Sequence, residues 1–127
     1  QVTLLPALVS LAPNQSLRDA LLEAQSGSKA DSGNAAIDVI TSGIVAFSSA
    51  DRFEDAVFVA ASAGGAADAR AALAGSLAGA HFGAGGIPQP LIDQLEGRIY
   101  LTLAAPWFYR TIQLMTGRGI SMEANGR

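Results

Sequence analysis

Apolar residues recur at steps of three and four positions along most of this chain. This is the period of an α-helix, and no long run alternates in the manner of a β-strand. The segment 35–48 is the clearest case, because Ile37, Ile40 and Ile44 fall on one helical face. Comparable patterns predict helices over residues 17–25, 51–63, 68–82 and 88–95. The hydrophobic pattern therefore predicts an all-α fold, arranged as a compact multi-helix bundle.

The two ends of the chain are less regular than its middle. Residues 2–11 are apolar but interrupted by Pro6, which predicts a short helix or an irregular lead-in. Residues 99–116 predict one or two helical segments divided by Pro106, and the tail from Gly117 lacks an apolar repeat and is expected to be loose. The densest aromatic cluster, for which core packing or a subunit contact is expected, consists of Trp107, Phe108 and Tyr109.

Local signals mark two helix starts and one close helix contact. Ser16 and Asn34 are predicted N-caps, because their side-chain oxygens can accept from unpaired backbone N–H groups. The helix expected over residues 68–82 carries small residues every four positions, so another backbone can approach it closely. This stripe consists of Ala71, Gly75, Gly79 and Gly83. Arg70, His81 and the shortness of the run favour a buried helix of a soluble protein over a membrane helix.

Composition narrows the classes of partner. A length of 127 residues predicts a single domain. Of these residues 50% are hydrophobic and 15% are charged, whereas about 25% are charged in a typical soluble domain. We interpret this shortage of charge as a large surface buried against another chain, with an alanine-rich composition as the alternative explanation. The net charge is −3 and Lys29 is the only lysine, which argues against a nucleic-acid partner. The absence of cysteine fits a reducing, cytoplasmic location, and no apolar stretch is long enough to span a membrane.

The most distinctive motif is the run Gly64 to Ala69, which reads Gly-Gly-Ala-Ala-Asp-Ala and is followed by the glycine-rich helix and by Ile87-Pro88. This order resembles the signature of the ADP-ribosylglycohydrolase family, which is Gly-Gly-Asp-x-Asp-Thr/Ser, then an Ala/Gly helix, then Ile-Pro. Upstream matches, which begin at Ser32-Gly33, extend the resemblance over residues 32–98. The matching motifs belong to the second half of the family fold.

The resemblance implies a larger all-helical fold whose active members cleave the bond between ADP-ribose and an acceptor. In that family a pair of magnesium or manganese ions lies between a Thr/Ser-Asp-Asp run in the first half and the glycine-pair motif in the second. Ala66 and Ala69 stand here where the family has the first aspartate and the hydroxyl. Magnesium needs several oxygen ligands, and only Asp68 of this motif retains one.

The sequence therefore predicts no catalytic residue. Gly64, Gly65 and Asp68 are the candidate ligand-binding residues, because a glycine pair before a helix is a generic anion-binding geometry. We interpret Asp68 as a helix cap, with a remnant metal ligand as the alternative. His81 is expected to be a partly buried structural residue. No cofactor is expected for this chain alone, and magnesium or manganese only if a partner half completes the site.

Three functions remain open. The preferred one is a catalytically degenerate ADP-ribosylglycohydrolase-like protein, inactive alone, that serves as a structural, assembly or interaction subunit in a homo-oligomer or larger complex. The second is the C-terminal half of a split, magnesium-dependent hydrolase. The third is a metal-free binder of ADP-ribose or a related nucleotide.

Overall fold

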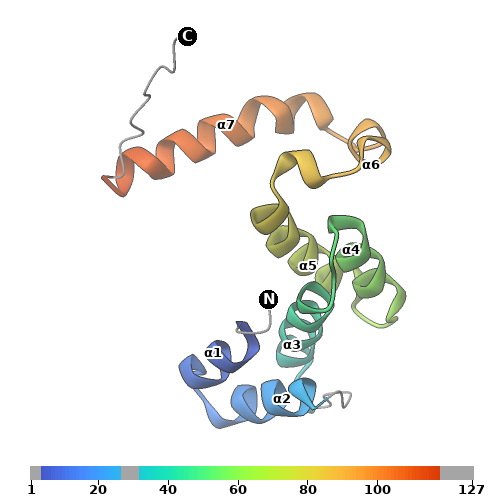
Figure 1. Ribbon diagram of the computed structural model, residues 1–127, viewed down its shortest axis with the longest axis vertical. Coiled ribbons are helices and arrows are strands. Elements are labelled where there is room, and N and C mark those ends of the chain that lie inside the picture. Colours follow the sequence, from blue (N-terminus) through green and yellow to red (C-terminus); the bar gives the residue numbers. More distant parts are fainter. Residues whose placement is uncertain (1–3, 27–31, 118–127) are drawn as a thin grey trace. The chain divides into compact units, whose positions relative to one another are not determined.

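The computed structural model describes residues 4–26 and 32–117, in which every regular element is a helix (Figure 1). The predicted all-α fold is confirmed. The chain divides into two units, Gln1–Pro88 and Gln89–Arg127, each described here by itself. The prediction of a single domain over residues 1–127 stays a prediction.

The first unit contains five α-helices and one short 3-10 helix within its described residues. These are α1 (Leu4–Leu11), α2 (Gln15–Gln25), α3 (Ala35–Ser48), α4 (Phe53–Ser62), α5 (Ala67–Phe82) and the 3-10 helix η1 (Ala84–Gly86). The second unit contains α6 (Gln89–Asp93) and α7 (Arg98–Met115). The predicted helices are thus present, with starts that shift by up to two residues over most of the first unit.

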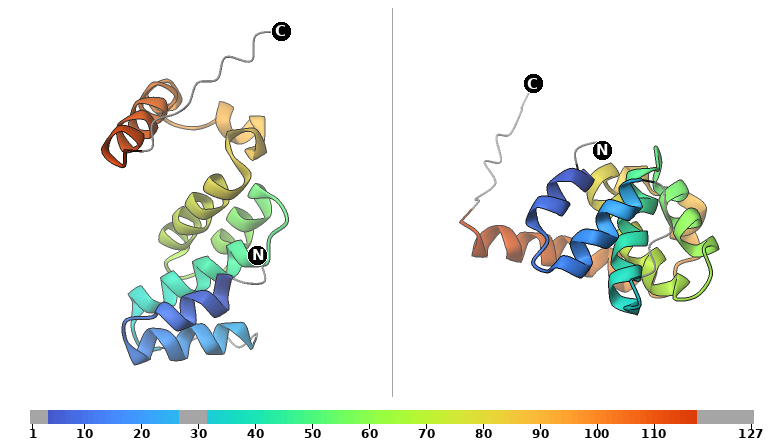
Figure 2. Two further views of the ribbon diagram at one scale, coloured as in Figure 1. Left: turned by 60° about the vertical axis from the view of Figure 1, so that its left-hand side comes forward. Right: turned by 90° about the horizontal axis from the view of Figure 1, so that it is seen from below.

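The core of the first unit is formed where α3, α4 and α5 pack against one another (Figure 2). Alanines are the most buried residues of this core, and Ala46, Ala60 and Ala74 form one buried cluster. Small side chains let helix axes approach closely. The centre of the contact surface on α5 is therefore the alanine face of Ala74 and Ala78, both 0% exposed, which lies one residue before the predicted stripe.

The glycines of the predicted stripe lie at the edge of this contact. A Cβ atom at Gly75 would meet Val57 Cγ2 at 3.3 Å, and one at Gly79 would meet Phe53 Cε2 at 3.8 Å. A Cβ atom at Gly83 would meet nothing within 4 Å, but Gly83 adopts φ 72°, so the backbone at the end of α5 favours glycine. As predicted, α5 is a buried helix with a face of small residues. Its most buried positions, however, are alanines and not the glycines of the predicted stripe.

A second cluster joins α1 and α2 to α3. Leu21 of α2 is 2% exposed and packs with Ala12 and Ile44. Asn34 caps α3 as predicted, since its side chain accepts from the backbone N–H groups of Ala36 and Ile37. The prediction for Ser16 is wrong, because α2 begins at Gln15 and its N-cap is Asn14.

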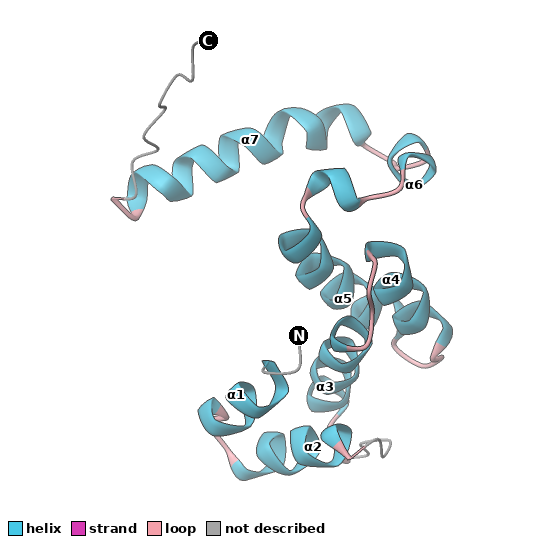
Figure 3. Cartoon of the chain, viewed as in Figure 1, coloured by secondary structure: helices cyan, strands magenta, loops and turns pink. Residues whose placement is uncertain are grey.

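Helix α7 runs without a break from Arg98 to Met115 (Figure 3). The predicted division at Pro106 is therefore not present, and the segment is one helix. Within the second unit, Trp107, Phe108 and Tyr109 are not packed into a core, because these side chains are 62–77% exposed. The expectation of core packing or a subunit contact stays a prediction. The tail from residue 118 lies outside the described residues. In the part of the chain that the structure describes, no helix is long and apolar enough to cross a membrane.

Candidate ligand and metal site

The motif loop joins the end of α4 to the start of α5. Gly64 and Gly65 adopt φ angles of 72° and 58°, in the left-handed region that side chains disfavour. The N–H of Ala67 donates to the carbonyl of Gly65 over 2.8 Å and begins the helix. Both glycines are therefore required by the backbone of the turn, whether or not it binds a ligand.

Arg70, a residue of α5, holds this loop in place through hydrogen bonds. Its Nη1 donates to the carbonyl of Gly64 over 3.0 Å and more loosely to that of Ala60 over 3.5 Å. Its Nε donates to Ser42 Oγ of α3 over 2.6 Å. Hydrogen bonds from an ionised donor are stronger than neutral ones. The guanidinium thus connects the motif loop, the last turn of α4 and the middle of α3.

A second polar contact fixes the start of α3. Asp38 Oδ1 accepts from the backbone N–H of Ser32 over 3.0 Å and from its hydroxyl over 2.8 Å. These two hydrogen bonds hold the pKa of Asp38 below its ordinary value. Ser42 Oγ donates to the carbonyl of Asp38, so Asp38 and Arg70 are linked through Ser42.

The lowered pKa of Asp38 predicts a pH-dependent contribution to stability. A carboxyl group with a lower pKa in the folded state stabilises the fold above its unfolded pKa. This contribution is lost as the pH falls through the folded-state pKa. We expect Asp38→Asn to be less stable than the wild type at neutral pH and the difference to shrink in acid. Urea unfolding from pH 7 down to pH 2 checks this, and a difference that grows in acid contradicts it.

Asp68 does not cap its helix. The N-cap of α5 is Ala66, no side-chain cap bond is formed there, and Asp68 is the second residue of the helix. A capping side chain has to precede the first helical residue, and Asp68 lies two residues after the N-cap, so the predicted cap is wrong. Its exposed carboxylate in the first turn still interacts favourably with the helix dipole.

The residues of the motif loop do not fit a pair of magnesium ions. Ala66 and Ala69 offer no side-chain oxygen, and Asp68 has no second carboxylate beside it. Within residues 4–26 and 32–117, no three His, Cys, Asp or Glu side chains gather where they could hold a metal ion. Bridging carboxylates are what hold two ions close together. A two-metal mechanism therefore cannot be built from these side chains.

His81 also differs from its prediction. The residue is exposed, at the last turn of α5, and its ring packs edge-on against two phenylalanines. The ring centroids lie 5.7 Å from Phe47 and 4.8 Å from Phe82. This aromatic contact supports a structural role at the surface of the unit.

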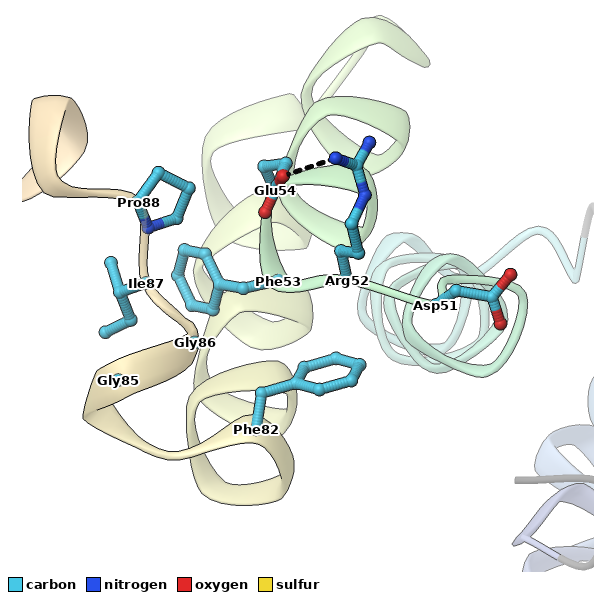
Figure 4. Close-up of a pocket in the computed structure, with 9 residues that line it drawn as sticks. All are labelled: Asp51, Arg52, Phe53, Glu54, Phe82, Gly85, Gly86, Ile87 and Pro88. Atoms are coloured by element: carbon cyan, nitrogen blue, oxygen red, sulfur yellow. Dashed lines mark ion pairs between the residues drawn. The ribbon is translucent and has the colours of Figure 1, made fainter.

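An open pocket of about 410 Å³ lies at the opposite end of α4 from the motif loop (Figure 4). The ring of Phe53 points toward Ile87 and Pro88, so the Ile-Pro motif forms one wall. At the rim, Arg52 Nη1 lies 2.9 Å from Glu54 Oε1. The positive charge of Arg52 is thus already paired, which makes this pocket a poor phosphate site. The sequence pattern did not indicate this pocket.

The helices and the motif loop define an all-α protein built around an alanine- and glycine-rich helix that follows a glycine pair. The sequence profile described as ADP-ribosylglycohydrolase matches residues 3–118, and the chain belongs to this family. The match extends beyond residues 32–98, over which the motifs alone indicated a resemblance.

A segment of 74 residues is 39% identical to the ADP-ribosylarginine hydrolase Tri1 of Serratia proteamaculans (strain 568). This segment makes up 58% of the present chain but only 20% of that relative. No solved structure matches the chain.

Proposed function

We propose that this chain is a catalytically degenerate member of the ADP-ribosylglycohydrolase family that acts as a structural or assembly subunit. The proposal rests on the side chains of the motif loop that could bind a metal ion, of which Asp68 is the only carboxylate. The guanidinium of Arg70 holds the loop through hydrogen bonds to Gly64 and Ser42, so a protein group supplies a contact that orders it. The exposed apolar side chains of α7 support a role through protein contacts.

An activity assay tests the loss of catalysis. The chain is incubated with an ADP-ribosylated arginine substrate in the presence of magnesium or manganese, and free ADP-ribose is measured. The substrate is chosen because the Serratia relative is described as an ADP-ribosylarginine hydrolase. We expect no release above the protein-free control. Metal-dependent release by this chain alone would contradict the proposal.

Asp68→Asn provides a matched test of whether the remaining carboxylate has a metal role. We expect the substitution to change the free energy of unfolding by less than about 1 kcal/mol, because only the helix-dipole interaction is lost. Added magnesium should leave the melting temperature of the wild type and of the variant unchanged. A magnesium-dependent stabilisation that Asp68→Asn removes would show that Asp68 is a ligand.

The second candidate is the C-terminal half of a split hydrolase. It is favoured by the coverage of the Serratia relative, of which the matched segment is one fifth. Such an assembly would have to supply magnesium or manganese and nearly all of their ligands from its other half. Metal uptake and ADP-ribose release by a reconstituted pair would favour this reading.

A metal-free ADP-ribose binder is the remaining alternative. The turn at Gly64 and Gly65 exposes the start of a helix, but the carboxylate of Asp68 lies in the first turn and repels an anion. Calorimetric titration with ADP-ribose tests it, and the absence of both heat and a change in stability would exclude it. The predictions of no cofactor for this chain alone and of a cytoplasmic location stay predictions.

A further inference from the structure

Few contacts hold the motif loop, which spans residues 63–66 between α4 and α5. In the first unit, a Cβ atom built at Gly64 or at Gly65 would meet nothing within 4 Å, so nothing packs against the turn where those atoms would lie. Among the described residues, the guanidinium of Arg70 makes the only side-chain hydrogen bonds to this loop. The conformation of the loop therefore depends on how Arg70 is held.

Arg70 is held by Ser42, which lies in the middle of α3. Arg70 Nε donates to Ser42 Oγ over 2.6 Å, and Arg70 Nη1 donates to the carbonyl of Gly64 over 3.0 Å. A guanidinium is planar and rigid, so a hydrogen bond at Nε fixes the direction in which Nη1 points. The hydroxyl of Ser42 thus directs Arg70 toward the loop.

The hydroxyl of Ser42 is oriented for this contact. Ser42 Oγ donates to the backbone carbonyl of Asp38, one turn earlier in α3. A hydroxyl has one proton to donate and two lone pairs that accept, so use of the proton within α3 leaves the lone pairs for Arg70. Helix α3 therefore presents a fixed acceptor to the guanidinium.

Arg70 has neutral acceptors only, which are the carbonyls of Gly64 and Ala60 and the hydroxyl of Ser42. No ion pair links it to a carboxylate within residues 4–26 and 32–117. Hydrogen bonds from an ionised donor are stronger than those between neutral groups. The loss of one acceptor is therefore costly, and no ion pair of Arg70 compensates for it.

We propose that Ser42 and Arg70 form a latch between α3 and the motif loop, and that the loop opens as a unit when this latch is broken while the helical core stays folded. Segments held by few contacts open locally at a lower free energy than the whole fold. The inference goes beyond the proposed function, because the latch controls the loop whether or not the loop binds a ligand. Ser42 is then a positioning residue that acts through Arg70.

Hydrogen exchange of single amides measures this opening. The amide of Ala67, which bonds to the Gly65 carbonyl, reports on the loop, and the amides of the buried Ala74 and Ala78 report on the core. We expect Ser42→Ala to accelerate exchange at Ala67 about tenfold, the factor that one hydrogen bond to a charged group provides. Exchange at Ala74 and Ala78 should change little, because alanine is the better helix former in α3.

Three further variants test the mechanism. Ser76→Ala is the matched control, because Ser76 Oγ donates to the Ala72 carbonyl one turn earlier and has no arginine contact; exchange at Ala67 should be unchanged. Ser42→Thr keeps the hydroxyl and should exchange as slowly as the wild type. The double variant Ser42→Ala/Arg70→Met should exchange no faster than Arg70→Met, because both substitutions break the same latch.

Three results would overturn the inference. Unchanged exchange at Ala67 in Ser42→Ala would mean that the hydroxyl does not hold Arg70. Equal acceleration at Ala67 and at the buried alanines of α5 would mean that the loop opens only when the whole unit unfolds. Effects that multiply in the double variant would mean that Ser42 and Arg70 act independently. None of these results involves a metal ion, so the proposed loss of metal chemistry is tested separately.

Discussion

Ala60→Leu is expected to lower the free energy of unfolding of the first unit by about 3 kcal/mol. Ala60 is 0% exposed and contacts Ala46 and Ala74 where α3, α4 and α5 meet. This junction is built from methyl groups, so no flexible side chain is available to move aside. The added carbon atoms must push the three helices apart or adopt a strained rotamer.

Ala61→Leu is the matched control for this substitution. Ala61 is the next residue of α4 and is exposed, so the same atoms are added with the same change in helix propensity. Urea unfolding followed by circular dichroism measures both variants. If Ala61→Leu and Ala60→Leu are equally stable, the alanine junction is not as tight as the structure indicates.

Arg70→Met is expected to destabilise the fold by about 2 kcal/mol. The substitution keeps an unbranched apolar stem and removes the donors to Gly64, Ala60 and Ser42. Hydrogen bonds to charged groups contribute about 1.5–3 kcal/mol, and exposure of the Gly64 carbonyl to water offsets part of the loss. The effect should be concentrated in the motif loop, because the other ends of these bonds lie within regular helices.

Native-state hydrogen exchange distinguishes this local role from a general loss of stability. The amide of Ala67 bonds to the Gly65 carbonyl. We expect Arg70→Met to accelerate the exchange of this amide more than that of the amides in the middle of α3. Asp68→Asn is the neighbouring control and should not alter the exchange. Unchanged exchange at Ala67 in Arg70→Met would show that the guanidinium does not fasten the loop.

Local sequence signals determined most of the fold but not every helix start. Asn34 was identifiable as a cap because one capping residue stands directly before an apolar repeat. Before α2, both Asn14 and Ser16 are good caps, and the structure uses Asn14, whose Oδ1 accepts from the N–H of Leu17 over 2.8 Å. The uninterrupted helix through Pro106 shows that the proline was not enough to end α7. Single residues bias a helix boundary, and the surrounding helix decides it.

The candidate site was predictable where its residues lie close together in the sequence. The glycine pair and the missing ligands at Ala66 and Ala69 lie within one short motif, so they could be read directly. The contact between Arg70 and Ser42 joins residues 28 positions apart and could be found only once α3 and α5 were packed. The sequence could not decide whether Asp68 precedes the helix or lies inside it, because helix starts are uncertain by one or two residues.

Manganese uptake by the purified chain tests the central claim most directly. Mn²⁺ binds the oxygen ligands that suit magnesium, and electron paramagnetic resonance distinguishes the free ion from the bound one. The account predicts no saturable binding at stoichiometric protein concentration, and the same spectra for the wild type and for Asp68→Asn. Saturable uptake of one or two ions per chain that Asp68→Asn abolishes would contradict it and show that the motif loop is still a metal site.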